Sequence, residues 1–139
     1  MKLIFLDIDG VLNTYSTYSR ERCVVEGDKL DLVAALAKES GAEIVLSSSW
    51  RLAPREAWER EFTLRKLEIF GVTPRLEGGN RRKEILSYME DLDCVDSFVI
   101  FDDLRGGWGV LASGLVFVDG RRGISKKNIL KAEKLLALD

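Results

Sequence analysis

Four short, mainly apolar runs stand out in the pattern of hydrophobic and polar positions along the chain. They cover residues 3–6, 43–46, 97–101 and 115–118, and polar side chains follow closely after each. Runs of this length without regular polar alternation are typical of strands buried on both faces. Segments with helical spacing lie between them, and strands that alternate with helices pair in parallel. The sequence therefore predicts an α/β fold: a three-layer, doubly wound, Rossmann-like parallel sheet in one domain over residues 1–139.

Cap and turn residues divide the segments between these runs into predicted helices. Asp28 is placed to cap the first helix, and Gly41 suits its C-terminal end. Pro54 suits the first turn of a second helix, which we expect to continue until Gly71 closes it. Residues 72–74 then form a short edge strand, because proline is confined to such positions in sheets.

Two more helices and one irregular segment complete the predicted order. Asn80 and Ser125 are N-cap residues of the third and fourth helices. The polar residues 13–25 are expected to form a loop or a small flap. The apolar start of the chain stops at Asp7 without a small-residue cleavage site, so we expect a buried strand there and not a secretion signal.

The absence of histidine and the small number of cysteines limit the kinds of catalytic and metal site that the chain can form. The sequence has no histidine, which removes the commonest general base and leaves metal binding to oxygen ligands, as Mg²⁺ prefers. Cys23 and Cys94 are far apart, so a reducing cytoplasm suits the chain better than a disulfide framework. A net charge of −2 indicates no general nucleic-acid footprint, and the apolar runs are too short to predict a membrane span.

Acidic and hydroxyl side chains follow the predicted strands where each one ends. Asp7 and Asp9 follow the first strand, the serines at 47–49 follow the second, and Asp102 and Asp103 follow the third. The carboxyl ends of parallel strands meet at one edge of a sheet, where ligands bind. Carboxylates gathered there would repel one another, and a divalent cation relieves that repulsion. The sequence therefore predicts a cofactor, Mg²⁺, at this edge.

A cationic side chain is also expected at this edge. Lys83 lies near the positive end of the third helix, where anions are favoured, with Lys66, Arg81 and Arg82 as nearby competitors. Asp119, after the last strand, is expected to be a turn residue. Carboxylates, hydroxyls, a cation and Mg²⁺ together suit a phosphoryl group, which a carboxylate can attack to form an aspartyl-phosphate.

These positions carry a family resemblance. Residues 6–13, LDIDGVLN, resemble motif I of the haloacid dehalogenase-like (HAD) hydrolase superfamily, the hydrophobic-DxDGxL pattern. The strand-end serines resemble motif II, Lys83 resembles motif III, and the pair at 102–103 resembles motif IV, in the order of the family. Residues 44–51 are also similar to a small bacterial and phage subgroup with a VLSSSWR stretch, which includes domains grouped with RNA-repair proteins.

The resemblance implies a fold and a magnesium-dependent phosphatase activity. Asp7 would be the nucleophile and a metal ligand. Asp9 would protonate the leaving oxygen and then activate water, and its main-chain carbonyl would be a second metal ligand. Asp103 would bind the metal, with Asp102 acting through water or through the other ligands.

The remaining implied roles concern the substrate. Ser48 would hydrogen-bond the phosphoryl oxygens. Ser47 is a close alternative, because three consecutive serines leave open which of them aligns with motif II. Lys83 would be the catalytic cation. Ser49 and Arg51 are further candidate substrate-binding residues, and Arg51 is placed to reach a second phosphate.

The short intervals between the motifs imply a capless protein with at most a minimal flap. Tyr15, Tyr18 and Arg20 in this flap are candidate substrate contacts. An open site favours a large phosphorylated substrate, either a nucleic-acid end or a phosphoprotein, and no membrane. The oligomeric state is left open.

Two other functions compete with phosphatase activity. A signalling receiver domain also combines an acidic pair, a hydroxyl and a lysine around Mg²⁺, but its phosphorylated aspartate follows a middle strand and not the first. A non-catalytic phosphate-binding module is the other alternative. The intact set of Asp7, Asp9, Lys83 and Asp103 argues against it.

Overall fold

The computed structural model describes residues 1–137, which form a five-stranded parallel sheet in the order β3-β2-β1-β4-β5. Leu6 in the central strand pairs in register with Leu46 on one side and Phe101 on the other. The strands are β1 (Lys2–Leu6), β2 (Glu43–Leu46), β3 (Ile69–Val72), β4 (Ser97–Asp102) and β5 (Leu115–Phe117). The α/β prediction with parallel pairing is confirmed.

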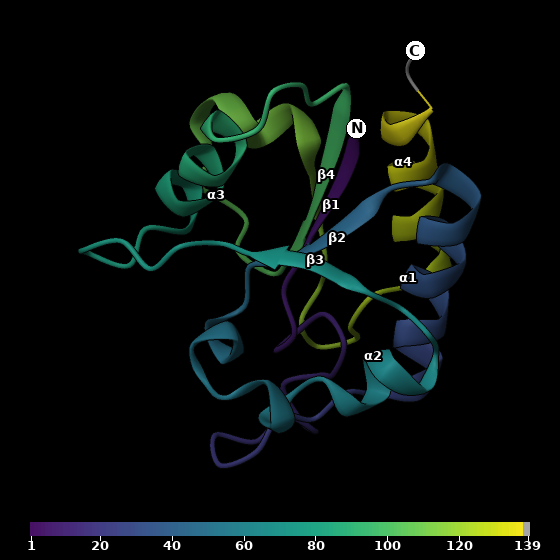
Figure 1. Cartoon of the computed structure of the whole chain (residues 1–139). Coiled ribbons are helices and arrows are strands. Elements are labelled where there is room, and N and C mark those ends of the chain that lie inside the picture. Colours follow the sequence, from purple (N-terminus) through teal and green to yellow (C-terminus); the bar gives the residue numbers. More distant parts are fainter. Residues whose placement is uncertain (138–139) are drawn as a thin grey trace.

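Helices cover both faces of this sheet, which gives the three predicted layers. Helices α1 and α4 lie together on one side of the sheet and α3 lies on the other (Figure 1). The helices are α1 (Gly27–Ser40), α2 (Arg60–Leu64), α3 (Arg81–Glu90) and α4 (Lys126–Leu136), with 3-10 turns η1 (Ser49–Leu52), η2 (Arg55–Ala57) and η3 (Gly109–Gly114).

Alternation along the strands separates two apolar clusters. Leu6, Leu46 and Phe101 pack with α1 and α4, whereas their neighbours Phe5, Val45 and Ile100 pack with α3 and η3. Successive strand side chains point to opposite faces. The residues two positions after this second set are Asp7, Ser47 and Asp102, so the polar row at the strand ends belongs to the α3 face.

Three of the predicted helix ends are confirmed and one differs. Gly41 ends α1 in the left-handed conformation with a φ of 73°, and the Asn80 side chain accepts from the backbone N–H of Lys83. Ser125 and Asn128 form a capping box at the start of α4. Helix α1, however, begins at Gly27, so Asp28 lies in its first turn.

The single helix predicted from Pro54 to Gly71 is wrong. This stretch contains η2, the short α2 and then strand β3. Trp58 and Phe62 do pack edge to face at 6.2 Å, as their helical spacing suggested, but the backbone leaves the helix at Trp58 with φ −137°. Gly71 lies inside β3, where a Cβ atom would collide with the hydroxyl of Tyr88. The edge strand thus begins three residues earlier than the predicted residue 72.

The residues between β1 and α1 contain no helix or strand, as expected for a loop or flap. Cys23 and Cys94 are free thiols. Among residues 1–137, no helix has the length and apolar character needed to cross a membrane.

Candidate active site

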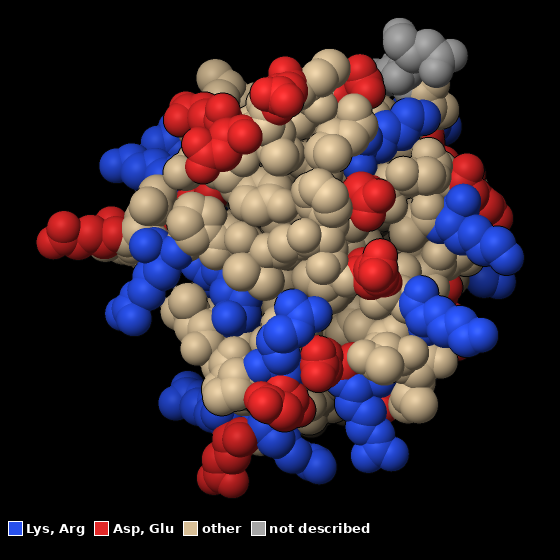
Figure 2. Space-filling model, viewed as in Figure 1, with Lys and Arg blue, Asp and Glu red and all other residues tan. Residues whose placement is uncertain are grey.

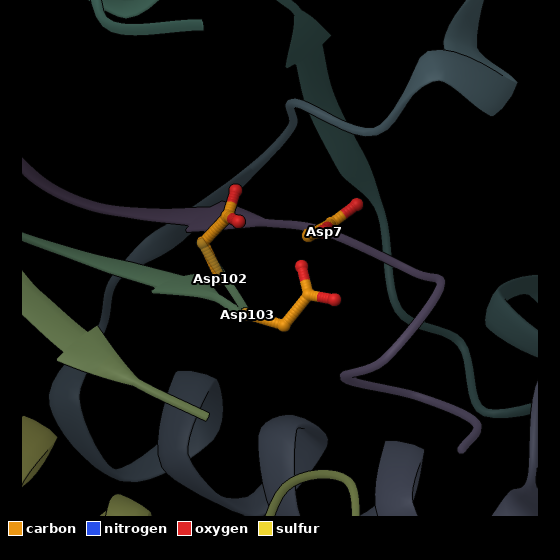
Figure 3. Close-up of side chains that lie close together, drawn as sticks. All are labelled: Asp7, Asp102 and Asp103. Atoms are coloured by element: carbon orange, nitrogen blue, oxygen red, sulfur yellow. The ribbon is translucent and has the colours of Figure 1, made fainter. Parts of the chain in front are cut away.

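Three carboxylates meet where β1 and β4 end. Asp7, Asp102 and Asp103 each offer an oxygen, and these oxygens all lie within 4.8 Å of one another. Figure 3 shows the three side chains gathered beside the two strand ends, with the Asp103 carboxylate turned toward Asp7. Asp7 and Asp102 are buried and Asp103 is half-buried. The convergence predicted for these strand-end aspartates is therefore present in the fold.

The site has an unusual electrostatic balance. Burial raises the pKa of Asp7 well above its usual value, and the charges of Asp102 and Asp103 add to this, while Arg81 opposes it. Burial likewise raises the pKa of Asp102. A cluster of this kind favours bound protons or a bound cation. Its donors are oxygens alone, the set that suits a hard divalent ion such as Mg²⁺.

Arg81, the first residue of α3, is the cation that reaches these carboxylates. Its Nη1 lies 3.1 Å from Oδ2 of Asp7 and 2.7 Å from Oδ2 of Asp102. Although burial lowers the pKa of Arg81, the two carboxylates raise it above its usual value. Lys83 is exposed and forms no ion pair with any carboxylate of residues 1–137. The structure thus brings one of the competing cations, and not Lys83, to the cluster.

Asp9 does not join the three-carboxylate cluster. Its Oδ1 accepts a hydrogen bond from Nδ2 of Asn13 at 2.9 Å, and its Oδ2 accepts one from Nε1 of Trp50 at 3.1 Å. Asn13 is itself fixed, because its Oδ1 accepts from the N–H of Gly10 at 2.9 Å. Two donors, one from the flap and one from η1, therefore hold both oxygens of the Asp9 carboxylate.

The three serines have different surroundings. The hydroxyl of Ser47 is buried and has no hydrogen-bond partner among residues 1–137. The hydroxyl of Ser48 accepts from the N–H of Trp50 at 3.2 Å and caps η1. Ser49 is exposed in the first position of that turn. Ser47 is therefore the serine of the three whose hydroxyl is buried and still lacks a partner in the described chain.

The guanidinium group of Arg51 already bonds to other groups of the protein. Its Nε donates to the carbonyl of Thr73 at 2.8 Å, and its Nη1 donates to that of Ser48 at 3.0 Å. Its Nη2 forms a buried ion pair with Oε2 of Glu84 at 3.0 Å. With only 4% of its side chain exposed, Arg51 ties the serine loop to the end of β3 and to α3. The predicted contact with a second phosphate stays a prediction, and these bonds would have to change for it.

Tyr15 attaches the flap to the segments that follow β4 and β5. Its hydroxyl donates to Oδ2 of Asp103 at 2.7 Å, and its N–H donates to the carbonyl of Gly120 at 2.9 Å. The bond to Asp103 and partial burial raise the pKa of Tyr15 to about 12. Gly120 leaves the space that the tyrosine ring fills, since a Cβ there would overlap the ring.

The rest of the flap is held at its base. The Asn13 side chain donates to the carbonyl of Val24 at 2.8 Å, and the N–H of Glu26 donates to that of Leu12 at 2.8 Å. Tyr18 is 38% exposed, and Arg20 is also exposed. Neither has a hydrogen bond to the three carboxylates.

Sequence reasoning singled out the carboxylates but not the partners of Asp9. Asn13 stands inside motif I and Trp50 directly after the serines. Both are donors four or fewer residues from a motif position, a signal that could have identified them as candidates. Asp119 is the predicted turn residue, because its carbonyl accepts from Arg122 and Gly123, and its side chain pairs with Arg121.

Comparison with known families identifies the family of the chain. A family model described as "HAD domain in Swiss Army Knife RNA repair proteins" matches residues 3–129, which include all the site positions above. No curated protein matches the chain with significance. Since the family match extends from β1 into α4, the chain belongs to the family of HAD domains in Swiss Army Knife RNA repair proteins.

Proposed function

We propose that this protein is a Mg²⁺-dependent phosphatase that removes a terminal phosphate from a nucleic-acid end through an aspartyl-phosphate. The observation that carries the proposal is the buried Asp7 carboxylate, which lies at the end of β1 between Arg81 and two further aspartates. Membership of a HAD family supports the reaction type.

Asp7 is the proposed nucleophile. Its Oδ1 accepts the N–H of Ile8 at 2.8 Å, which fixes the carboxylate plane, and its Oδ2 faces Arg81. In the first step an Asp7 oxygen bonds to phosphorus while the bond from phosphorus to the leaving oxygen breaks, and Asp9 gives that oxygen a proton. In the second step water attacks the same phosphorus, Asp9 accepts the proton of the water, and Asp7 leaves as a carboxylate.

The remaining charges at the site suit the phosphoryl group. Mg²⁺ held by Asp7, Asp102 and Asp103 would supply positive charge that offsets that of the phosphoryl oxygens. Arg81 adds a planar donor fork that suits these oxygens. The free hydroxyl of Ser47, on the same face of the sheet as Asp7, supports Ser47 as the donor of motif II. Lys83 is the alternative cation, and the activities of Arg81→Met and Lys83→Met would separate the two.

The nature of the substrate rests on the open site and on the name of the matched family. The flap contains no helix or strand that could enclose a small molecule, and the family occurs in RNA repair proteins. On the face shown in Figure 2, acidic and basic side chains are interspersed around the edge and over the lower half, and uncharged residues fill the upper centre. With a net charge of −2 as well, recognition of a polyanion would depend on a few cations close to the site.

A substrate panel tests the proposal. The purified protein would be assayed with p-nitrophenyl phosphate, with 3′- and 5′-phosphorylated oligonucleotides and with a phosphopeptide, each with and without Mg²⁺. We expect magnesium-dependent release of phosphate, with an oligonucleotide as the best substrate. Preference for the phosphopeptide would overturn the substrate class. A stable phosphoprotein after treatment with acetyl phosphate, without turnover, would favour the receiver alternative.

Binding of Mg²⁺ is expected to stabilise the protein. At 100 times the dissociation constant, a ligand that binds only the folded state adds about 2.7 kcal/mol, which corresponds to a rise in Tm of roughly 5–10 °C for a domain of this size. Because the pKa values of Asp7 and Asp102 are raised, protons compete with the ion, and the rise should shrink as pH falls.

Differential scanning calorimetry at several pH values would measure this rise. Asp103→Asn should reduce it, while Asp119→Asn, a change at an exposed turn, should leave it intact. An equal rise in wild type and Asp103→Asn would contradict the proposed ligand set.

Trp50 is a proposed positioning residue for Asp9. Trp50→Phe keeps an aromatic ring but removes the donor to Oδ2 of Asp9. We expect kcat to fall by about 10-fold or more, the scale of one hydrogen bond to a charged group, with a shifted pH profile and little change in KM.

Trp58→Phe is the matched control. The indole nitrogen of Trp58 is buried and has no hydrogen-bond partner in the described chain, so this change removes ring area but no hydrogen bond. Below the unfolding temperature its kcat should stay near that of the wild type. Similar losses in both variants, with unshifted pH profiles, would indicate that Trp50 only packs.

A further inference from the structure

A cavity of about 520 Å³ opens directly beside the carboxylates. Its walls are the loop that enters α3 (residues 78–82) and the loop that follows β4 (residues 102–104 and 107–108). It shares Arg81, Asp102 and Asp103 with the proposed active site. Cavities of this size hold small ligands, so a group that fills it would adjoin the phosphoryl position.

Arg82 is a second cation in the lining of this cavity, and it forms no ion pair in the described chain. The charge of Arg81 is balanced by Asp7 and Asp102. Arg82, in contrast, forms no ion pair with a carboxylate of residues 1–137, and its Nε is buried without a hydrogen-bond partner there. A buried guanidinium nitrogen without a partner favours an added acceptor.

Glycines leave room for the Arg82 guanidinium and in the loop that precedes it. A Cβ atom on Gly109 would lie 2.8 Å from Nη1 of Arg82, so a side chain there would push the guanidinium from its place. On the same wall as Arg82, Gly78 and Gly79 have φ values of 88° and 61°, and a Cβ on either would meet no atom within 4 Å. The loop wall of the cavity is thus uncrowded at Gly78 and Gly79, and Arg82 belongs to the same wall.

We propose that this cavity binds the second phosphate of the substrate, the internucleotide phosphodiester next to the terminal phosphate, through Arg82. The inference rests on the proposed function and refines it. Guanidinium groups pair with phosphate oxygens through two parallel hydrogen bonds. In a nucleic-acid end, the nearest anion after the terminal phosphate is the adjoining phosphodiester, whereas a mononucleotide or p-nitrophenyl phosphate has no such group.

The test compares substrates that differ by this one phosphate. With the terminus that the panel identifies, kcat/KM would be measured for a nucleoside monophosphate and for the dinucleotide that bears the same terminal phosphate. We expect the wild type to prefer the dinucleotide by about 10-fold, and Arg82→Gln to remove most of that preference. The slope of log(kcat/KM) for the dinucleotide against log salt concentration should become shallower by about one.

Two variants serve as controls. Arg82→Lys keeps the charge and should recover part of the preference. Arg55→Gln removes an exposed arginine that pairs with Glu59 away from this cavity, and it should keep the preference of the wild type. A dinucleotide preference that survives Arg82→Gln, or an equal loss on p-nitrophenyl phosphate, would overturn the assignment.

A binding experiment separates this inference from the proposed reaction. Affinity for a labelled terminally phosphorylated pentanucleotide would be measured by fluorescence anisotropy, in Asp7→Asn and in Asp7→Asn with Arg82→Gln. A loss of about 10-fold in the double variant supports the subsite even if the wild type turns over no substrate, a result that would refute only the phosphatase proposal. Equal affinity in both would refute the subsite.

Discussion

Asp7→Asn is expected to lower kcat by about 10⁴-fold or more, the scale of losing the nucleophile in other enzymes with covalent intermediates. An asparagine can still accept the N–H of Ile8 and occupy nearly the same volume, so the fold should persist. Its amide cannot displace the leaving oxygen from phosphorus. Rates would be measured with p-nitrophenyl phosphate, and acid-quenched protein would be examined for a phosphorylated aspartate.

Two control variants show whether the loss of activity is specific to Asp7. Asp119→Asn changes a half-buried aspartate near a strand end, paired with Arg121, and should retain full turnover. Asp9→Asn should slow both chemical steps but still bind Mg²⁺, and a wild-type rate in that variant would remove its acid–base role. Full turnover by Asp7→Asn would show that the nucleophile lies elsewhere.

Arg81→Met should lower kcat/KM by about 10²–10³-fold, the usual cost of removing one preorganised donor from a developing charge. Arg81 is the cation within hydrogen-bond distance of both Asp7 and Asp102. Without it, two buried carboxylates lose their counter-charge, so Tm in the absence of Mg²⁺ should also fall. Steady-state kinetics and calorimetry would measure the two effects separately.

Lys83→Met is the comparison that decides between the two cations. Lys83 is exposed on the same turn of α3, and its replacement should change kcat/KM by less than about threefold if Arg81 is the catalytic cation. A severe loss in Lys83→Met with a mild one in Arg81→Met would instead support the lysine assigned from the sequence pattern. Arg81→Lys tests whether charge alone suffices.

The identity of this cation shows what the sequence could and could not predict. Asn80 was a recognisable cap, so the start of α3 was predictable. The side of the helix that faces the strand ends was not, because residues two apart on a helix point about 200° apart. Arg81 and Lys83 therefore face different surroundings, and only the packing of α3 on the sheet shows which of them meets Asp7.

Strands whose formation follows from their own apolar residues were predicted well. Strands β1, β2 and β4 are apolar runs that end in acids or hydroxyls, and their burial follows from that pattern. A continuous helix from Pro54 was predicted because Trp58 and Phe62 have helical spacing. The prediction was wrong because the chain turns after Leu64 and supplies the edge strand β3. The need for that edge strand comes from the sheet and not from these residues.

Arg51 illustrates a second limit. An arginine close after a phosphate-binding motif is a natural candidate to bind an anion, and the position of Arg51 in the sequence favoured this interpretation. Its main partner is Glu84, a buried residue on α3 that is 33 positions away. A glutamate within a helical stretch of mixed charge gives no sign that it is buried, so this ion pair could be found only in the folded structure.

The attachment of Tyr15 to Gly120 and Asp103 bears on how products leave. In many enzymes a loop must open before product can depart, and that motion limits turnover. Here the segment beside the site is fastened both at its base and through its tyrosine. A segment attached in this way is expected to stay in place during turnover, so the formation and hydrolysis of the proposed aspartyl-phosphate, and not a loop movement, would set the rate.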